Sequence, residues 1–461
     1  MFLNSVFERF VKESPVAVMV RGLLENVLTP ASVDALFEQH AQSQYTRALL
    51  FSQLVELMGQ VVCGIYPSAH AAYQKQAERF TVSRTAVYDK SNGVEPQVSA
   101  ALTRQTAAQL TAVIRDLGAA LPPLLPGHRV KILDGNCLAK TEHRLQELRT
   151  VAAGPLPGKS LVVLDPALML AIDVFPCEDG HTQERALLAQ VLATVEANDV
   201  WIEDHNFCTL GFLFGIAARQ ATFVVRQHQN LPWAAVTELA YAGGSADVAV
   251  WEQQIRLDHP ATGAPLQVRR LELRLPTPTR DGDRVIHVLT TLSAQEASAS
   301  TVADLYRQRW KIETLFQVLE AALESEQTRL GYPKAGLFAF CVSLVAYNVL
   351  AVVRAALRAV PTRAVVEAKV STYYLTHEIK GVYQGMMIAL PAAEWEHFRA
   401  MTTAQLAVAL KALASKARLS AYQRHPRGPK KPRPKRIHYK DKPHVSTARL
   451  IANRGKEKRS P

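Results

Sequence analysis

The most informative segment of this chain reads Tyr306-Arg-Gln-Arg309-Trp-Lys-Ile-Glu313-Thr-Leu-Phe-Gln-Val-Leu-Glu320. Positions 306, 309, 313 and 320 follow helical spacing, so one helix would carry these four side chains along a single stripe. A phenol, a guanidinium and a carboxylate side by side suit a site that holds phosphate oxygens and places one metal-binding acid. The stripe therefore predicts phosphodiester chemistry. The alternative is a solvated amphipathic helix with ordinary i,i+4 ion pairs.

Length and composition set the general class of the protein. A chain of 461 residues predicts two to four domains, and 48% hydrophobic with 20% charged residues is typical of soluble globular proteins. No apolar run reaches the roughly 18 uninterrupted residues that predict a membrane span. The longest candidate runs from Leu337 to Val353 and is interrupted by Ser343, Tyr347 and Asn348. We expect a buried helix there and no membrane partner.

The cysteines and the N-terminal residues favour a reducing compartment. The five cysteines are scattered, odd in number and without a CxxC pair, so neither a disulfide framework nor a zinc site is predicted. The first ten residues lack the charged-then-apolar plan of a signal peptide. We therefore expect a cytoplasmic protein.

The net charge of +12 is concentrated at the C-terminus. Residues 416–461 hold sixteen Lys and Arg against two acids, a net of +14, which leaves −2 for residues 1–415. The run from His425 to Arg436 contains four prolines and almost no apolar residues, so we predict an extended, disordered basic tail that attracts a polyanion. Nucleic acid is the favoured partner, and a solubility tail is the alternative. The residues predicted to contact DNA here are Arg427, Lys430, Lys431, Arg433, Lys435 and Arg436.

Changes in sequence pattern divide the chain into six parts. Residues 1–125 show helical periodicity and end at a proline-rich break. Residues 126–229 alternate short apolar strands with helices, including a helix expected at Glu184–Ala197, which predicts an α/β fold with a partly parallel sheet. Turn residues and polar-apolar alternation predict an antiparallel β insertion at 230–293. Residues 294–355 return to the core, where Thr301 begins a predicted capping box, and residues 356–415 are expected to be helical before the tail at 416–461.

Acidic residues follow two of the predicted strands. Asp134 ends the apolar run Val130-Lys-Ile-Leu, and Asp204 ends the run from Asp199, while Glu313 lies on the later helix. Three such carboxylates could hold two divalent ions that activate a water or a 3′-hydroxyl and stabilise the leaving oxygen of a phosphodiester. Magnesium suits this role because it takes hard oxygen ligands and keeps positions open for water and phosphate. Three other acids compete on the same grounds: Asp165, Asp173 and Glu203. Of these, Asp165 precedes Pro166 and is better explained as a turn residue.

The segment from Tyr306 resembles the signature helix of the insertion-sequence-four family of DDE transposases, written Tyr-(2)-Arg-(3)-Glu-(6)-Lys. Tyr306, Arg309 and Glu313 match this motif. Trp310, Ile312, Phe316 and Leu319 fit its usual apolar frame. The resemblance extends to the Asp134-Gly135 strand end, to Asp204 and to the β insertion, and so covers roughly residues 125–350.

The resemblance carries implications for fold, site and partners. It implies an RNase H-like catalytic core, interrupted by the β insertion, with Asp134, Asp204 and Glu313 as catalytic and metal-binding residues. Tyr306 and Arg309 would contact phosphates of the transposon end, with Lys311 beside them. The cofactor would be Mg²⁺, with Mn²⁺ as a substitute. The partners would be terminal-repeat DNA bound by residues 1–125, target DNA and a second copy of the chain, near the bacterial nucleoid.

One position departs from the family pattern. Glu320 stands where the motif has a basic residue, and a carboxylate there would repel a phosphate. Either a nearby base such as Lys311, Arg329 or Lys334 takes over this role, or binding of the DNA end is weakened. Two alternatives to a transposase stay open: a metal-dependent nuclease that cuts without joining, and a catalytically impaired transposase relic that only binds DNA.

Overall fold

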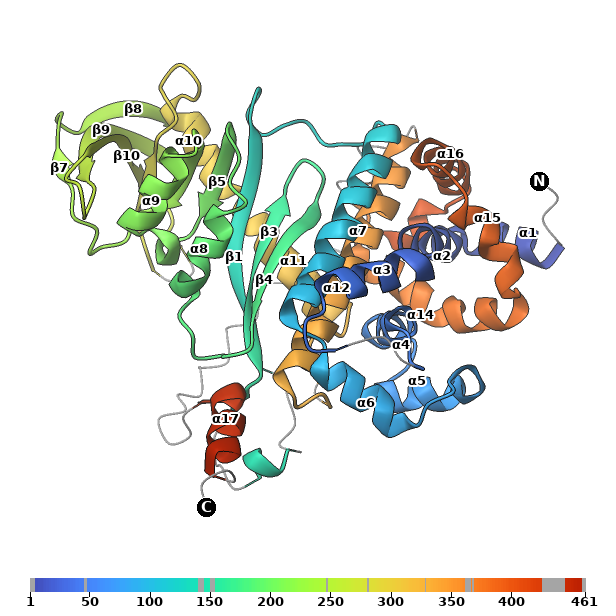
Figure 1. The fold of residues 1–461 in the computed structure, drawn as a ribbon. Helices are drawn as coiled ribbons and strands as arrows, with labels where there is room; N and C mark the ends of the chain where they lie inside the picture. The colour runs from blue at the N-terminus through green and yellow to red at the C-terminus, as the bar shows by residue number, and fades with distance from the viewer. Residues whose placement is uncertain are drawn as a thin grey trace.

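A ten-stranded mixed sheet forms the centre of the protein (Figure 1). The computed structural model describes residues 5–44, 48–139, 145–149, 154–245, 248–279, 282–327, 329–360, 366, 369–424 and 444–457. The strand order is β4-β3-β1-β5-β6-β11-β10-β9-β7, with β8 paired to β9. The strands are β1 Arg129–Leu138, β3 Gly158–Asp165, β4 Leu170–Cys177, β5 Asp199–Glu203, β6 Thr222–Arg226, β7 Ala234–Ala235, β8 Ala240–Ser245, β9 Val248–Asp258, β10 Pro265–Arg274 and β11 Val285–Thr290.

The first half of this sheet combines antiparallel and parallel pairing. Strand β1 runs antiparallel to β3, and β3 runs antiparallel to β4. On its other side β1 runs parallel to β5, and β5 runs parallel to β6. The predicted α/β texture with a partly parallel sheet is therefore confirmed.

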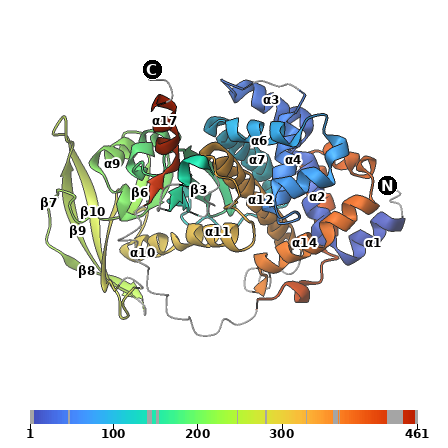
Figure 2. The same cartoon turned by 90° about the horizontal axis from the view of Figure 1, so that it is seen from below.

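Two hydrophobic cores lie on opposite faces of the sheet. Along β1, Ile132 belongs to one core and Leu133 to the other, because successive side chains of a strand point to opposite faces. Figure 2 shows α10 (Ala299–Arg307) and α11 (Trp310–Ala321) along one side and α9 (Leu210–Ala217) on the other. Burial on both faces explains why the strands of this region are rich in valine, leucine and isoleucine.

The helix predicted at Glu184–Ala197 is shorter in the structure. A 3₁₀ turn, η3, covers Glu184–Leu187, and the helix α8 covers only Leu188–Leu192. The Asp199 carboxylate accepts a hydrogen bond from the N–H of Glu196 at 2.8 Å, and Asn198 has φ +66°. These local interactions turn the chain into β5 and end the helix early.

The predicted β insertion continues the central sheet. Strand β11 pairs antiparallel with β6 through Val288↔Arg226, Leu289↔Val225 and Thr290↔Val224, and β10 and β9 follow in order. The antiparallel hairpins predicted for 230–293 are thus present, joined edge to edge with the core strands. This joining covers the edge of β6, which would otherwise be open to pairing with other chains.

The segment Tyr306–Glu320 is divided between two helices, so the prediction of one continuous helix is wrong. Helix α10 ends at Arg307 and α11 begins at Trp310. Between them the N–H groups of Arg309 and Ile312 donate to carbonyls three residues earlier, which tightens the backbone into a 3₁₀ turn. The cap of α10 is also three residues earlier than predicted, because the Ser298 side chain accepts from the N–H of Thr301.

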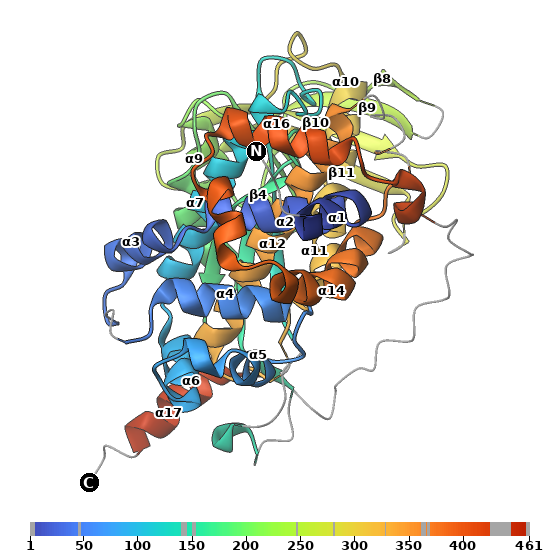
Figure 3. The same ribbon diagram turned by 90° about the vertical axis from the view of Figure 1, so that its right-hand side faces the viewer.

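Helices from both ends of the chain pack together on the β4 side of the sheet (Figures 1 and 3). Helix α12 (Pro333–Ala359) is buried along its whole apolar stretch, which confirms the core helix predicted from Leu337 to Val353. Among the described residues, α12 alone is long and apolar enough to cross a membrane as a single helix. The bent pair α2 (Pro15–Val27) and α3 (Pro30–His40) also passes this test of length and composition. The helices from the two ends of the chain are α1 Ser5–Glu13, α2 Pro15–Val27, α3 Pro30–His40, α4 Phe51–Val62, α5 Ala69–Lys75, α6 Arg84–Gly93, α7 Pro96–Asp116, α12 Pro333–Ala359, α14 Thr372–Ala389, α15 Glu396–Arg399 and α16 Thr403–Ala414.

The end of the predicted basic tail is folded. Strand β12 (Val445–Ser446) pairs with β2 (Pro155–Leu156), and α17 (Thr447–Glu457) follows. Thr447 is fully buried, and Arg449 pairs with Asp179. The prediction of a tail disordered from 416 to 461 is therefore wrong for 445–457, which strand pairing and buried side chains hold on the protein. It is also wrong for 416–424, where a 3₁₀ turn (Leu419–Tyr422) forms, Tyr422 is buried and Gln423 bridges to Val370.

Candidate metal-dependent catalytic site

Asp134 and Asp204 lie at the same place on neighbouring strands. The parallel pairing of β1 and β5 ends at Ile132↔Ile202, so both acids come two residues after the last paired positions. Asp204 follows β5, as predicted. Asp134 lies within β1, which continues to Leu138 beside β3, so the prediction that it ends its strand is wrong. The carboxyl ends of adjacent parallel strands are a common place for ligands in α/β sheets.

Glu313 lies on α11 and is connected to Asp134 by the side chain of Arg309. The Arg309 guanidinium donates to Asp134 Oδ2 at 3.3 Å and to Glu313 Oε1 at 2.7 Å. The side chain of Arg309 therefore connects Glu313 to Asp134, although Arg309 and Asp134 are 175 positions apart in the sequence. Among the described residues, no three His, Cys, Asp or Glu side chains are grouped closely enough to hold a metal ion, and a guanidinium lies between two of the predicted ligands.

The acids of this site repel one another, and the positive charge of Arg309 attracts them. Burial raises the pKa of Asp134 to about 6 against the effects of Arg309 and the Gly135 N–H, and Asp204 and Glu184 raise it further. Burial also acts to raise the pKa of Asp204, but Arg309 and His205 outweigh it and the pKa is lowered. The acids are thus close enough to repel one another, and Arg309 is the cation that offsets this repulsion.

The other residues of the signature segment differ in exposure. Tyr306 is buried, and burial raises the pKa of its hydroxyl to about 12, with a further contribution from the charge of Asp204. Lys311 is half-buried. Trp310, expected in the apolar frame, is 56% exposed instead, beside a hollow of about 270 Å³ that Tyr306 and Arg309 also line. Glu320 is exposed.

The competing acids lie elsewhere. Asp165 accepts hydrogen bonds from the N–H groups of Ala167 and Leu168, which confirms it as a turn residue. Glu203 is fully buried on the face of the sheet that carries Leu133, and burial raises its pKa well above the usual value. Asp173 pairs with Arg104 of α7.

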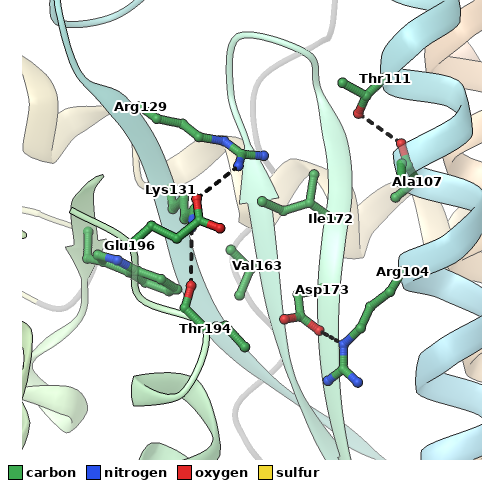
Figure 4. Close-up of a pocket in the computed structure, with 12 residues that line it drawn as sticks. Arg104, Ala107, Thr111, Arg129, Lys131, Val163, Ile172, Asp173, Thr194 and Glu196 are labelled. Atoms are coloured by element: carbon green, nitrogen blue, oxygen red, sulfur yellow. Dashed lines mark hydrogen bonds and ion pairs between the residues drawn. The ribbon is translucent and has the colours of Figure 1, made fainter. Parts of the chain in front are cut away.

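Asp173 belongs to a separate pocket of about 200 Å³ between α7 and the sheet (Figure 4). Three basic side chains line it, and each has an acidic partner. Arg104 pairs with Asp173, Lys131 with Asp199 at 2.6 Å, and Arg129 with Glu196 at 3.8 Å. The basic side chains of this pocket are therefore neutralised by ion pairs. Asp173 belongs to this set and does not join Asp134.

Three residues near the acids were not predicted: Glu184, His205 and Asn206. His205 Nδ1 lies 3.2 Å from Asp204 Oδ2. The amide of Asn206 donates to Glu184, whose other oxygen lies against Gly135. His205 and Asn206 directly follow Asp204, which was a usable signal, whereas no pattern in the sequence links Glu184 to Asp134.

The basic residues predicted to contact DNA from Arg427 to Arg436 lie outside the described residues. The chain on either side of them is held to the protein. Before them, Arg424 donates from Nε to the carbonyl of Val370 at 3.1 Å, and after them Val445 donates to the carbonyl of Gly154 at 3.1 Å. The basic run therefore connects two anchored points.

Comparison with known proteins adds a family likeness. Residues 159–349 match the family model described as "Transposase DDE domain". This region contains Asp204 and Glu313, while Asp134 precedes it. A relative from Sinorhizobium fredii (strain NBRC 101917 / NGR234), named "Putative transposase y4zB", is 26% identical over 159 residues. That match covers 34% of this chain and 43% of the relative, so the chain spans less than half of the relative's length.

Among solved structures, the fold is similar to the piggyBac transposase in a cryo-EM synaptic complex with hairpin DNA. The TM-score is 0.42 at 8% identity, over 83% of this chain and 84% of that one.

Proposed function

We propose that the protein is a transposase that cleaves DNA at the ends of an insertion sequence and joins them to target DNA. One observation carries the proposal: Asp134 and Asp204 each come two residues after the last paired positions of parallel β1 and β5, and Arg309 links Asp134 to Glu313. The match of residues 159–349 to a transposase DDE domain supports it. The antiparallel β4-β3-β1 strands with parallel β5 and β6 support an RNase H-like core.

The chemistry of the three acids fits Mg²⁺ or Mn²⁺. Asp134, Asp204 and Glu313 offer carboxylate oxygens, which are the ligands that both ions prefer. Asp204 and Glu184 repel the buried carboxylate of Asp134, and a divalent cation would offset this repulsion. When bound, such ions activate an attacking water or 3′-hydroxyl and stabilise the leaving oxygen of a phosphodiester.

Arg309 has a second role in this proposal. Its guanidinium lies between Asp134 and Glu313, so those acids must release it before they take a cation. A guanidinium pairs well with phosphate, so the DNA backbone is its natural next partner. Tyr306, buried beside it, would hold Arg309 in position, and Lys311 would contact the same strand.

The remaining parts of the chain take supporting roles. The helices of residues 1–125 would bind the terminal repeats, and the basic run from Arg427 to Arg436 would add salt-sensitive affinity for DNA of any sequence. Two copies of the chain would be needed to hold two transposon ends together, with residues 356–415 as a dimerisation region.

The test is a cleavage and strand-transfer assay on the element's own terminal-repeat DNA. Wild type should cut and join with Mg²⁺, whereas Asp134→Ala, Asp204→Ala and Glu313→Ala should each lose both steps by at least about a thousandfold. Asp173→Ala is the matched control, because its carboxylate lies in the pocket of Figure 4. Undiminished cutting by any triad variant would remove that residue from the proposal.

The same assay separates the two other functions. Cutting without joining would identify a nuclease. Binding of terminal repeats without cutting by wild type would identify a transposase relic, a reading that Glu320 favours because it replaces the basic residue of the signature.

A further inference from the structure

Glu184 belongs to no predicted site, yet its carboxylate lies against strand β1 beside Asp134. It begins the 3₁₀ turn η3, which follows β4 in the chain. A Cβ built on Gly135, the residue after Asp134, would lie 2.2 Å from Glu184 Oε1. The carboxylate therefore packs directly on the Gly135 backbone, an approach that a side chain at position 135 would obstruct.

The second oxygen of Glu184 holds the turn that carries Asp204. It accepts a hydrogen bond from the side-chain amide of Asn206, in the 3₁₀ turn η4 (His205–Phe207). The neighbouring Arg185 donates from Nε to the carbonyl of Asn206 at 2.7 Å. Glu184 thus bridges strand β1 beside Asp134 and the turn that follows Asp204, while Arg185 fixes that turn.

A negative charge is not required for this bridge. A glutamine would accept the same hydrogen bond from Asn206 without adding charge beside Asp134. The charge of Glu184 instead increases the repulsion at Asp134, together with that of Asp204. Such repulsion is unfavourable in a protein without a cation and favourable for binding one.

We propose that Glu184 is a positioning residue and fourth carboxylate of the catalytic site, which holds strand β1 at Asp134 and the turn after Asp204 together and strengthens divalent-cation binding by its charge. This inference rests on the proposed function, because it requires a cation at Asp134, Asp204 and Glu313. In this role Glu184 contacts the neighbourhood of the metal-binding aspartates and orients them.

The test measures Mn²⁺ binding to the full chain without DNA, by isothermal titration calorimetry. Glu184→Gln keeps the acceptor for Asn206 and removes the charge, so Mn²⁺ affinity should fall by about tenfold. Glu184→Ala removes the bridge as well and should bind more weakly still. Glu196→Gln is the matched control, because Glu196 is exposed and precedes β5, whereas Asp204 follows β5. The Mn²⁺ affinity of Glu196→Gln should equal that of wild type.

Gly135→Ala supplies an independent route to the same contact. The added Cβ should displace the Glu184 carboxylate and weaken Mn²⁺ binding in an otherwise folded protein. In Glu184→Ala the displaced group is already absent, so the double variant should bind as Glu184→Ala does. Additive losses in the double variant would contradict the bridge.

The outcomes separate this inference from the proposed function. Mn²⁺ affinity equal to wild type in Glu184→Gln would overturn the charge role, and equal affinity in Glu184→Ala would overturn the bridge. In both cases cleavage by wild type and its loss in Asp204→Ala would leave the proposed function standing. If wild type neither binds Mn²⁺ nor cleaves DNA, the proposed function fails and the inference fails with it.

Discussion

At the scale of residues, Arg309 occupies the position of an internal cation. It donates to one oxygen of Asp134 and one of Glu313. Burial alone would lower the pKa of Arg309, but Tyr306, Asp204 and the two acids that it joins outweigh burial and raise it. A side chain that satisfies repelling carboxylates keeps them together in the absence of metal. The exchange of Arg309 for a divalent ion is the step on which the proposed activity depends.

Glu320 gives a prediction at this scale. The variant Glu320→Lys places a basic residue at the last position of the signature, near the end of α11. Its affinity for terminal-repeat DNA should rise by roughly three- to tenfold at low salt, with a salt dependence steeper by about one phosphate contact. A binding titration at several salt concentrations measures both quantities.

The control is Glu8→Lys, which makes the same charge change at an exposed position of α1. It should raise affinity much less than Glu320→Lys, because α1 does not contain the signature segment; any gain that it gives would report on the proposed terminal-repeat domain, so Glu238→Lys, at an exposed position between β7 and β8, is measured beside it. Equal affinities for Glu320→Lys and Glu8→Lys at matched salt would show that position 320 does not face the DNA end.

At the scale of elements, local patterns predicted most strands and helices, and tertiary contacts decided the rest. The apolar run Val130-Lys-Ile-Leu predicted β1, because burial on both faces selects valine, isoleucine and leucine. The 3₁₀ turn at Gln308 and Arg309 could not be predicted, since helical spacing continues through it. Nor could the folding of Val445–Glu457, whose partner strand Pro155–Leu156 is far away in the sequence.

Docking of α17 gives a prediction at this scale. Burial acts to raise the pKa of Asp179, but hydrogen bonds from Ser446, Arg449 and the His181 N–H outweigh it and lower the pKa to about 2. A carboxyl whose pKa is lower in the docked form stabilises docking above its free pKa of about 4 and loses this effect as the pH falls towards 2.

Hydrogen exchange of residues 447–457 measures this docking. Asp179→Asn should raise exchange about threefold at pH 6, because a partly exposed ion pair contributes at most about 1 kcal/mol. The difference from wild type should shrink between pH 4 and pH 2, as wild-type Asp179 becomes protonated. A difference that stays constant across this range would contradict the role of the Asp179 charge.

At the scale of the whole molecule, the site depends on how distant segments meet. The strands with Asp134 and Asp204 are brought together by parallel pairing, and α11 lies along the same side of the sheet as the core that contains Ile132 and Ile202 (Figure 2). The order of the three acids and their strand contexts predicted a triad, and the structure brings Asp134 and Glu313 together through Arg309. That the three acids bind a metal stays a prediction. The bridging role of Glu184 was beyond prediction, because it depends on η3 and η4 meeting in space.

The most direct test of the central claim is a crystal structure of the protein grown with saturating Mn²⁺ and measured at the manganese absorption edge. The account predicts an anomalous peak within bonding distance of carboxylate oxygens from Asp134, Asp204 and Glu313, with Arg309 withdrawn from between them. An Arg309 side chain still joining Asp134 to Glu313, with no peak beside them, would contradict it.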